Sequence, residues 1–401
     1  MDIRPITPDE YVPFFTTFWR TMNFGPQSDE AIERDKKVFL YERSLAAFDG
    51  TDVVGTAHSH LFDLTLPGLQ QVNAAGVTAI STASTHRRRG IISELKRRQL
   101  SEAHDRGEAA AILLASEGRI YQRFGYGAAA MCADVELRTK DTQFAAPNSG
   151  GRVRIVDGDT ADKIFPTVFS AACRRRAGSI DRPSYFWESA SADRDKKAVQ
   201  VVFENASGEP TGYVQYGTKM DWELGGQPNG KLTIQEFVTL DDVTTLELWW
   251  YLLSLDLIRD VEAWNQPVDD PLRWVLAEPR ALRTKAIRDR YWLRPLDVAR
   301  LLSSRTYAVD IDVTIDVADP LIGLGGTFTL TGGPSGAECS RNGKRGADVR
   351  MSISDLGAIV LGGVAPSQLA RAGRVDAGAE LLPRLDAAFV TSPSPWGATN
   401  F

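Results

Sequence analysis

The chain has 401 residues, 43% of them hydrophobic and 24% charged, which is typical of soluble, folded, mixed α/β proteins. A formal net charge of −6 argues against nucleic-acid binding through bulk charge and is better suited to a cationic partner. The length exceeds what one core supports, the three cysteines imply no disulfide framework, and the four histidines form no zinc pattern. No apolar run approaches the roughly 20 residues of a membrane span. We expect a cytoplasmic, multidomain protein without a metal site.

The first segment is predicted to mix helices and strands. In chain order we expect a helix over 11–24, a helix capped by Ser28, a hairpin over 44–57, a strand over 72–82, a helix over 90–105 and a buried strand over 110–115. On the helix over 90–105, the apolar residues lie roughly on one side and Gly107 is a plausible C-terminal cap. We expect Glu94, Lys96 and Arg97 on its polar side.

The rest of the chain divides into two further segments. After a linker at 148–151, the predicted elements are strands over 199–203, 212–216 and 232–240 and an apolar helix around 246–253. This order repeats the strand-then-helix unit of the first segment without its arginines, which indicates a duplicated fold that has lost its ligand site. From about residue 290 a short helix, further strands and a last helix follow. The predicted domains are therefore 1–147, 148–289 and 290–401.

A basic turn, His86-Arg87-Arg88-Arg89-Gly90, lies between a predicted strand and a predicted helix. A helix N-terminus offers free backbone N–H groups and a partial positive charge, so it binds anions readily. Gly90 lets the backbone approach a pyrophosphate without an intervening Cβ, and arginines add bidentate contacts. An isolated run of this kind is more often a solvated basic patch. The strand before it and the amphipathic helix after it favour a coenzyme phosphate site.

The turn resembles motif A of the GNAT superfamily of N-acetyltransferases, usually written Q/R-x-x-G-x-G/A. Arg87 and Gly90 match, whereas Ile92 replaces the final small residue. The resemblance implies acetyl-coenzyme A as co-substrate, with its pantetheine arm beside the preceding strand. The coenzyme-binding residues that it implies are Ile80, Ser81, Thr82, Arg87, Arg88, Arg89, Gly90, Ile91, Ile92, Ser93, Ser116 and Glu117.

Tyr121 is the candidate general acid. Acetyl transfer needs a proton for the departing thiolate, and tyrosine, with a pKa near about 10, is close to a thiol in acidity. Tyr121 falls at the position of the acid in the acetyltransferase motif, and Tyr126 is interpreted as a packing residue. Together with the basic turn, the segment over 115–127 is similar to the enhanced intracellular survival family of aminoglycoside acetyltransferases.

That resemblance covers the whole length and implies an architecture. We expect an α+β (mixed α/β) fold with two tandem acetyltransferase-like domains, the second degenerate, and a C-terminal sterol-carrier-protein-like domain, assembled as a homohexamer. It also implies that the terminal carboxylate of Phe401 enters the active site as general base and that the acceptor is a primary amine. Candidate acceptor contacts are Tyr11, Phe15, Phe24, Glu30, Glu33 and Asn400.

Two other functions remain open at this point. A lipid or sterol carrier would follow from the C-terminal domain, although the apolar run over 356–361 is more typical of a core than of a ligand tunnel. A catalytically silent acetyltransferase scaffold is the second, but Arg87, Gly90 and Tyr121 are intact, and a silent copy is expected to lose them.

Overall fold

The computed structural model describes residues 1–195, 197–341 and 346–401. It divides into two compact units. Unit 1 comprises residues 1–130, 291–392 and 400–401, and unit 2 comprises residues 131–290 and 393–399. No helix among the described residues is long and apolar enough to cross a membrane.

The first sheet of unit 1 has the strand order β1-β2-β3-β4-β5-β12. Its strands are β1 (Asp2–Arg4), β2 (Ser44–Asp49), β3 (Asp52–Thr65), β4 (Gln71–Thr82), β5 (Ala110–Leu113) and, from Tyr291 onward, β12 (Arg283–Pro295). Neighbours are antiparallel except β4 and β5, which are parallel because α3 connects them. Every residue of β5 is buried, as its wholly apolar sequence predicts.

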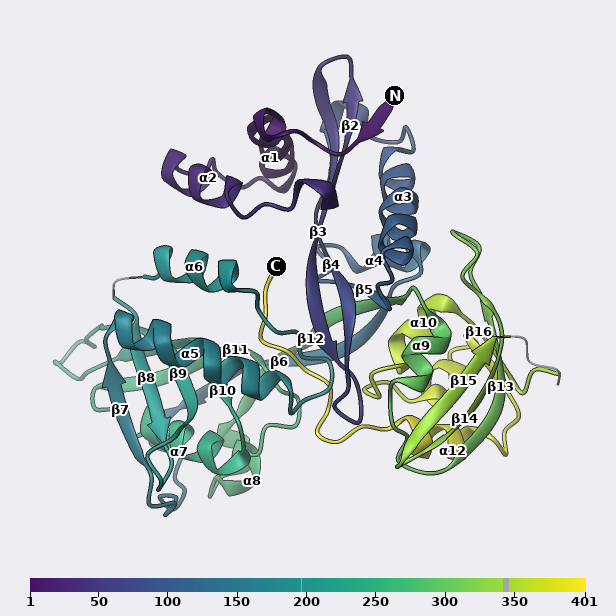
Figure 1. Ribbon diagram of the computed structural model, residues 1–401. Helices are drawn as coiled ribbons and strands as arrows, with labels where there is room; N and C mark the ends of the chain where they lie inside the picture. The colour runs from purple at the N-terminus through teal and green to yellow at the C-terminus, as the bar shows by residue number, and fades with distance from the viewer. Residues whose placement is uncertain (196, 342–345) are drawn as a thin grey trace. The chain divides into compact units, whose positions relative to one another are not determined.

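Helices cover both faces of this sheet (Figure 1). They are α1 (Tyr11–Met22), α2 (Asp29–Lys36), α3 (Ile91–Asp105) and the short α4 (Gly118–Tyr121). Phe14 of α1 packs in one apolar cluster with Ala46 and Val53, and Ile91 and Leu95 of α3 pack in another with Ala47 and Val54. Successive strand residues point to opposite faces, so β2 and β3 supply both clusters.

Both predicted helix caps are confirmed. The Ser28 hydroxyl accepts a hydrogen bond from the backbone N–H of Ala31 at 3.2 Å, which satisfies one of the free donors of α2. Gly107 follows α3 with φ +78°, the left-handed conformation that ends many helices.

The expectation that Lys96 lies on the polar side of α3 was wrong. Its side chain is fully buried, and its ammonium donates to the Tyr126 hydroxyl at 2.9 Å and to Gln99 Oε1 at 3.1 Å. Burial lowers the pKa of Lys96 well below its ordinary value. Helical periodicity could not predict this position, because the covering residue Tyr126 comes from a distant loop.

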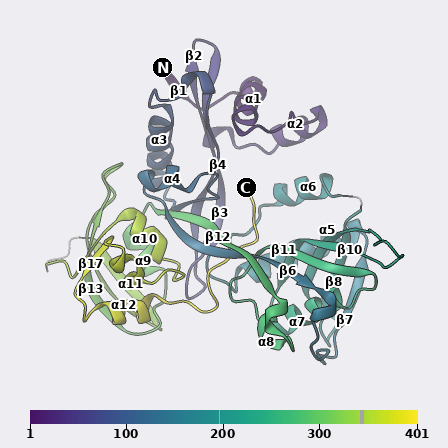
Figure 2. The ribbon, with the colours of Figure 1, turned by 180° about the vertical axis from the view of Figure 1, so that it is seen from behind.

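The C-terminal segment of unit 1 forms a second sheet, of which Figure 2 labels β13 and β17, and its strand order is β15-β14-β13-β16-β17. The strands are β13 (Ile311–Ala318), β14 (Gly326–Gly333), β15 (Gly336–Arg341), β16 (Val349–Ser352) and β17 (Val375–Ala377), and the helices are α9 (Val298–Ser303), α10 (Ile353–Ile359), α11 (Pro366–Arg371) and α12 (Leu382–Phe389). All residues of α10 are buried, and Val360 and Leu361 are buried after it. The apolar run over 356–361 therefore belongs to the core, as predicted.

Unit 2 contains a sheet with the order β6-β11-β10-β9-β8-β7. Its strands are β6 (Gly127–Arg138, from Met131 in this unit), β7 (Arg152–Val156), β8 (Val199–Glu204), β9 (Pro210–Lys219), β10 (Gly230–Thr239) and β11 (Ile258–Gln266), and its helices are α5 (Gly158–Cys173), α6 (Ser184–Ala192), α7 (Asp242–Leu253) and α8 (Leu272–Val275). β10 and β11 are parallel and α7 connects them, which repeats the β4-α3-β5 arrangement.

The repeated unit lacks the basic turn, as expected. The Asp241 side chain accepts the backbone N–H of Thr244 at 2.7 Å and caps α7, and Asp242 is its first residue. Carboxylates therefore occupy the helix N-terminus where unit 1 has arginines and Gly90. Their negative charge disfavours a phosphate at this end of α7.

Candidate active site

A bulge interrupts β4 close to the basic turn. Thr56 of β3 pairs with Ser81 and His58 pairs with Thr78, so Ala79 and Ile80 lie opposite one β3 residue. Ala79 has φ +51°, and its carbonyl accepts the Thr56 hydroxyl at 2.7 Å. A bulge takes backbone groups out of the ladder and redirects the strand. Beyond the bulge, Ser81 and Thr82 pair with Thr56 and Gly55, so the end of β4 stays in the ladder with a shifted register.

β4 and β5 separate before this bulge. Their parallel pairing, among the described residues, joins Ala74 with Ala110 and ends at Gly76 and Ile112. The β4 residues Ile80, Ser81 and Thr82 lie beyond that point. The side of β4 that faced β5 therefore has backbone donors and acceptors outside this ladder, next to the three residues predicted to contact pantetheine.

The basic turn is preformed and open. Arg88 has φ +64° and Gly90 has φ +80°, and α3 begins at Ile91. A Cβ built at Gly90 would meet no atom within 4 Å. The side chains of Arg87, Arg88 and Arg89 are exposed, and none forms an ion pair with another described residue. The turn thus combines three uncommitted guanidinium groups with the N-terminus of a long helix, an arrangement that favours anions.

His86 ties this turn to the β2–β3 hairpin. Its Nε2 lies 3.0 Å from Asp49 Oδ2, and its Nδ1 lies 2.8 Å from the Thr85 hydroxyl. The hydrogen bond from His86 lowers the pKa of Asp49. The contact fixes where the turn begins, a role that sequence reasoning did not assign to His86.

Tyr121 ends α4 and is 7% exposed. Burial raises its pKa, and a hydrogen bond with Ser116 opposes that shift. The phenol is therefore protonated at neutral pH and is able to donate. Tyr126, whose ring centroid lies 6.1 Å away, is completely buried and its hydroxyl is used by Lys96. Ser116 and Glu117, on the connection from β5 to α4, are exposed.

The last residue, Phe401, packs on the first sheet of unit 1. Its ring centroid lies 5.0 Å from that of Phe62 on β3 and 6.2 Å from that of Tyr291 on β12. Phe62 in turn covers Gly76, where a Cβ would come within 2.1 Å of its ring. Phe401 is therefore linked through Phe62 to the residue at which β4 and β5 part.

A row of rings on one face of β3 was missed by sequence reasoning. Phe39 stacks on His58 at 4.2 Å, His58 contacts His60 at 4.9 Å, and His60 contacts Phe62 at 5.7 Å between ring centroids. The predicted hairpin ended at residue 57, whereas β3 continues to Thr65, and residues 58, 60 and 62, which alternate along it, share a face. We call Phe39, His58, His60, Phe62 and Phe401 the ring row.

The candidate acceptor residues fall into two groups. Tyr11 and Phe15 contact Phe39, at 5.2 and 5.5 Å between ring centroids, and so join the ring row. The others are exposed, and none is brought to the row by a ring contact among the described residues; they are Phe24, Glu30, Glu33 and Asn400.

The two histidines of the row, of which His58 is buried and His60 half-buried, predict a loss of stability in acid. Burial lowers the pKa of His58 well below 6.5 and that of His60 to about 4. At pH values between the lowered pKa of each folded-state histidine and its ordinary pKa of 6.5, the unfolded chain binds more protons than the folded chain. The free energy of unfolding therefore falls as the pH falls. The slope is at most about 1.4 kcal/mol per pH unit for each histidine.

Denaturant unfolding of the wild type at about pH 7 and about pH 5 measures this loss. The His58→Leu/His60→Leu variant removes both titrations and should lose much less stability over the same interval. Equal losses in the two proteins would show that neither histidine is responsible.

Comparison with protein families assigns all three segments. Residues 2–129 match the model of an acetyltransferase (GNAT) domain, residues 178–300 match a second acetyltransferase (GNAT) domain, and residues 298–398 match a sterol carrier protein domain. The expected fold class is confirmed: two acetyltransferase domains and a C-terminal sterol-carrier-like domain in a mixed α/β chain.

Individual relatives match along the whole chain. An uncharacterized N-acetyltransferase of Streptomyces avermitilis is 33% identical over 98% of this chain and 98% of its own. The N-acetyltransferase Eis of Mycobacterium tuberculosis is 29% identical over 94% of this chain and 90% of its own. The crystal structure of Eis1 from Mycobacterium abscessus superposes with a TM-score of 0.89 at 32% identity and covers 100% of both chains. The similarity thus spans all three segments.

Proposed function

The chain belongs to the Eis family of GNAT N-acetyltransferases, and we propose that it acetylates primary amines of a cationic acceptor. The acceptor class is an aminoglycoside, a polyamine or a lysine side chain, and the acetyl donor is acetyl-coenzyme A. In this proposal Tyr121 is the general acid and the terminal carboxylate of Phe401 is the general base.

The coenzyme site is proposed along the end of β4 and the start of α3. Ile80, Ser81 and Thr82 would contact the pantetheine arm through backbone groups that the separation of β4 from β5 leaves outside the ladder. The basic turn would hold the phosphates. Gly90 supports this proposal, because no atom lies within 4 Å of the position that a Cβ at this residue would take. The proposed phosphate contacts are Arg87, Arg88, Arg89, Gly90, Ile91, Ile92 and Ser93, and Ser116 and Glu117 are proposed at the edge of the site.

The open turn, with three uncommitted arginines at the N-terminus of α3, is the observation that carries the proposal. Acidic residues occupy the corresponding place in unit 2, at Asp241 and Asp242. Coenzyme binding is therefore proposed for the first acetyltransferase domain alone.

The proposed transfer is a direct attack by the amine on the thioester carbonyl. A C–N bond forms, the C–S bond breaks, and Tyr121 gives its proton to the departing thiolate. The ammonium gives one proton to the carboxylate of Phe401 before it attacks. The proton that the nitrogen sheds after the C–N bond forms returns to the Tyr121 phenolate, and the carboxyl group of Phe401 then releases its proton to water. Burial keeps Tyr121 in its protonated form before the transfer.

The base must act on an amine that begins as an ammonium. An α-carboxylate titrates near about 3.5 and an alkylammonium near about 10, so the transfer needs an acceptor whose pKa is lowered by its surroundings. Multiply charged amines meet this need, because each ammonium lowers the pKa of its neighbours. The half-buried ring of Phe39 and the anionic C-terminus also favour a cation.

Release of free thiol from acetyl-coenzyme A tests the proposed reaction. Aminoglycosides, polyamines and lysine peptides are offered to protein that ends at Phe401, and coenzyme binding is measured separately by calorimetry. Thiol release with a panel member would establish the acceptor class. Coenzyme binding without release would reject these three acceptor classes, and absence of coenzyme binding would reject the proposed site itself.

The remaining predictions concern organisation. We propose domain boundaries at 1–147, 148–289 and 290–401 and assembly as a homohexamer in the cytoplasm. Light scattering of the full chain would measure the mass of the assembly. The match of residues 298–398 to a sterol carrier protein domain does not by itself establish a lipid-carrier function, and the apolar run of this domain is buried in its core.

A further inference from the structure

The end of the chain is bound along its backbone within unit 2. We call residues 393–399 the tail segment. The Ser394 N–H donates to Asp269 at 2.6 Å, and the Ser394 carbonyl accepts Arg176 Nε at 2.9 Å. Further along, the Trp396 N–H donates to the Ala177 carbonyl at 3.0 Å. These contacts use main-chain atoms of the tail segment, so they depend on its register more than on its side chains.

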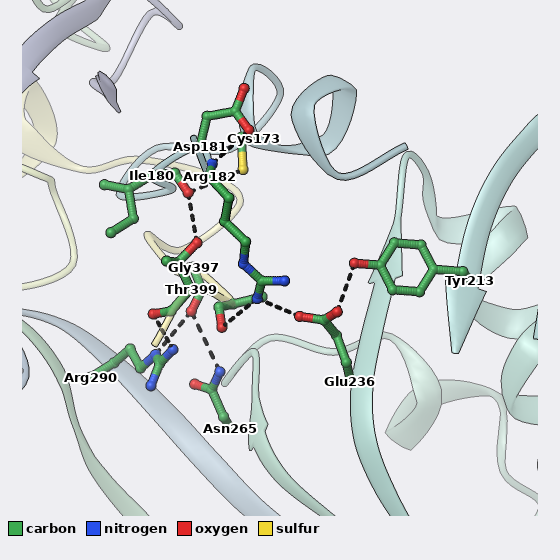
Figure 3. Close-up of polar contacts among 11 residues, drawn as sticks. Cys173, Ile180, Asp181, Arg182, Tyr213, Glu236, Asn265, Arg290, Gly397 and Thr399 are labelled. Carbon is green, nitrogen blue, oxygen red and sulfur yellow. Dashed lines mark hydrogen bonds and ion pairs between the residues drawn. The ribbon is translucent and has the colours of Figure 1, made fainter. Parts of the chain in front are cut away.

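Arg290 binds the last part of the tail segment (Figure 3). Its Nε donates to the Gly397 carbonyl at 2.9 Å, and its Nη2 donates to the Thr399 carbonyl at 2.7 Å. The Arg290 side chain is 2% exposed. One rigid guanidinium thus bridges two carbonyls that lie two positions apart, a geometry that only one register of the tail segment provides.

Other polar groups of unit 2 hold the same stretch. The Thr399 hydroxyl donates to the Ile180 carbonyl at 2.8 Å, and the Thr399 side chain is completely buried. Arg182 donates to the Ala398 carbonyl at 3.4 Å and is paired with Glu236, which also accepts the Tyr213 hydroxyl at 2.9 Å. Figure 3 shows these groups converging on residues 397–399.

The strand that carries Arg290 also continues into unit 1. Tyr291, the next residue of β12, has its ring 6.2 Å from the Phe401 ring. Between Thr399 and Phe401 there is only Asn400, which is exposed. Because Arg290 holds the Thr399 carbonyl in place, the terminal carboxylate can move only as far as the two residues after Thr399 allow.

We infer that Arg290 is a positioning residue for the terminal carboxylate and that unit 2 serves as the anchor of the tail segment. This inference rests on the proposed role of Phe401 as general base. It gives a function to the second acetyltransferase domain, whose helix α7 lacks the basic turn. Arg290 acts through main-chain carbonyls and need not touch either substrate.

The Arg290→Met variant of the full chain tests the inference. Without the guanidinium, the last residues leave their register more often, so a carboxypeptidase should release Phe401 about tenfold faster or more. In the amine assay kcat should fall about tenfold or more, with the coenzyme Kd unchanged. Arg290→Lys can donate to one carbonyl at a time and should give intermediate values in both measurements.

Arg288→Met is the matched control. Arg288 lies on the same strand and is paired with Asp134 at 3.0 Å, and none of its contacts among the described residues involves the tail segment. This variant should release Phe401 and turn over acceptor at wild-type rates. If Arg290→Met does not fold, as judged by thermal unfolding, Ser179→Ala replaces it, because the Ser179 hydroxyl donates to the Trp396 carbonyl at 2.7 Å.

The two readouts separate this inference from the proposed function. Wild-type release of Phe401 from a folded Arg290→Met protein would overturn the anchoring role. Faster release with unchanged kcat would overturn the link between anchoring and catalysis. If the wild type has no activity with any amine, the proposed function fails, whereas the release assay still decides whether Arg290 anchors the tail segment.

Discussion

Replacing Tyr121 with phenylalanine is expected to lower kcat by about 100-fold or more, the usual contribution of a general acid. The phenol is 7% exposed, and burial raises its pKa, so it carries the proton that the thiolate needs. Phenylalanine keeps the ring packing and removes the hydroxyl that carries the proton. The coenzyme Kd should stay within about twofold, because the phosphate turn is untouched.

Tyr126→Phe is the matched control for this prediction. Its hydroxyl accepts Lys96 and lies in a fully buried place, so its loss should lower the melting temperature. Its kcat should change much less than that of Tyr121→Phe. Turnover by Tyr121→Phe at the wild-type rate would remove Tyr121 from the mechanism.

Extending the chain beyond Phe401 is expected to lower kcat by about 100-fold or more. A short polar extension converts the terminal carboxylate into a peptide carbonyl, which cannot take a proton from the amine. Deleting Phe401 is expected to have a similar effect, because the new carboxylate at Asn400 is displaced by about 3.8 Å. Steady-state kinetics with each protein measure both effects.

Two controls accompany the extension. The same extension placed before Met1 should leave kcat unchanged, and Phe401→Leu keeps the carboxylate while removing the ring that contacts Phe62. Phe401→Leu should retain most of its turnover and show a higher KM for the acceptor. Full activity in the C-terminally extended protein would overturn the role of the carboxylate.

The tertiary structure determined the surroundings of several residues of the first acetyltransferase domain. Lys96 has a sequence position compatible with the polar side of α3, yet it is buried because Tyr126 covers it. The alternation of His58, His60 and Phe62 was readable, but the burial of His58 depends on Phe39, which comes from the connection after α2. The bulge at Ala79 has no sequence signal that we recognise, since it places a residue other than glycine at positive φ.

The sequence by itself determined what depends on neighbouring residues: the cap at Ser28, the buried strand β5, the glycine before α3 and the arginines beside it. These features arise from contacts within a few positions of the chain, where residue type and spacing decide the outcome. The anchoring of the tail segment is different, because Arg290 and the Thr399 carbonyl are 109 positions apart. Such a contact exists only after the sheet of unit 2 has formed, so only the tertiary structure could assign it.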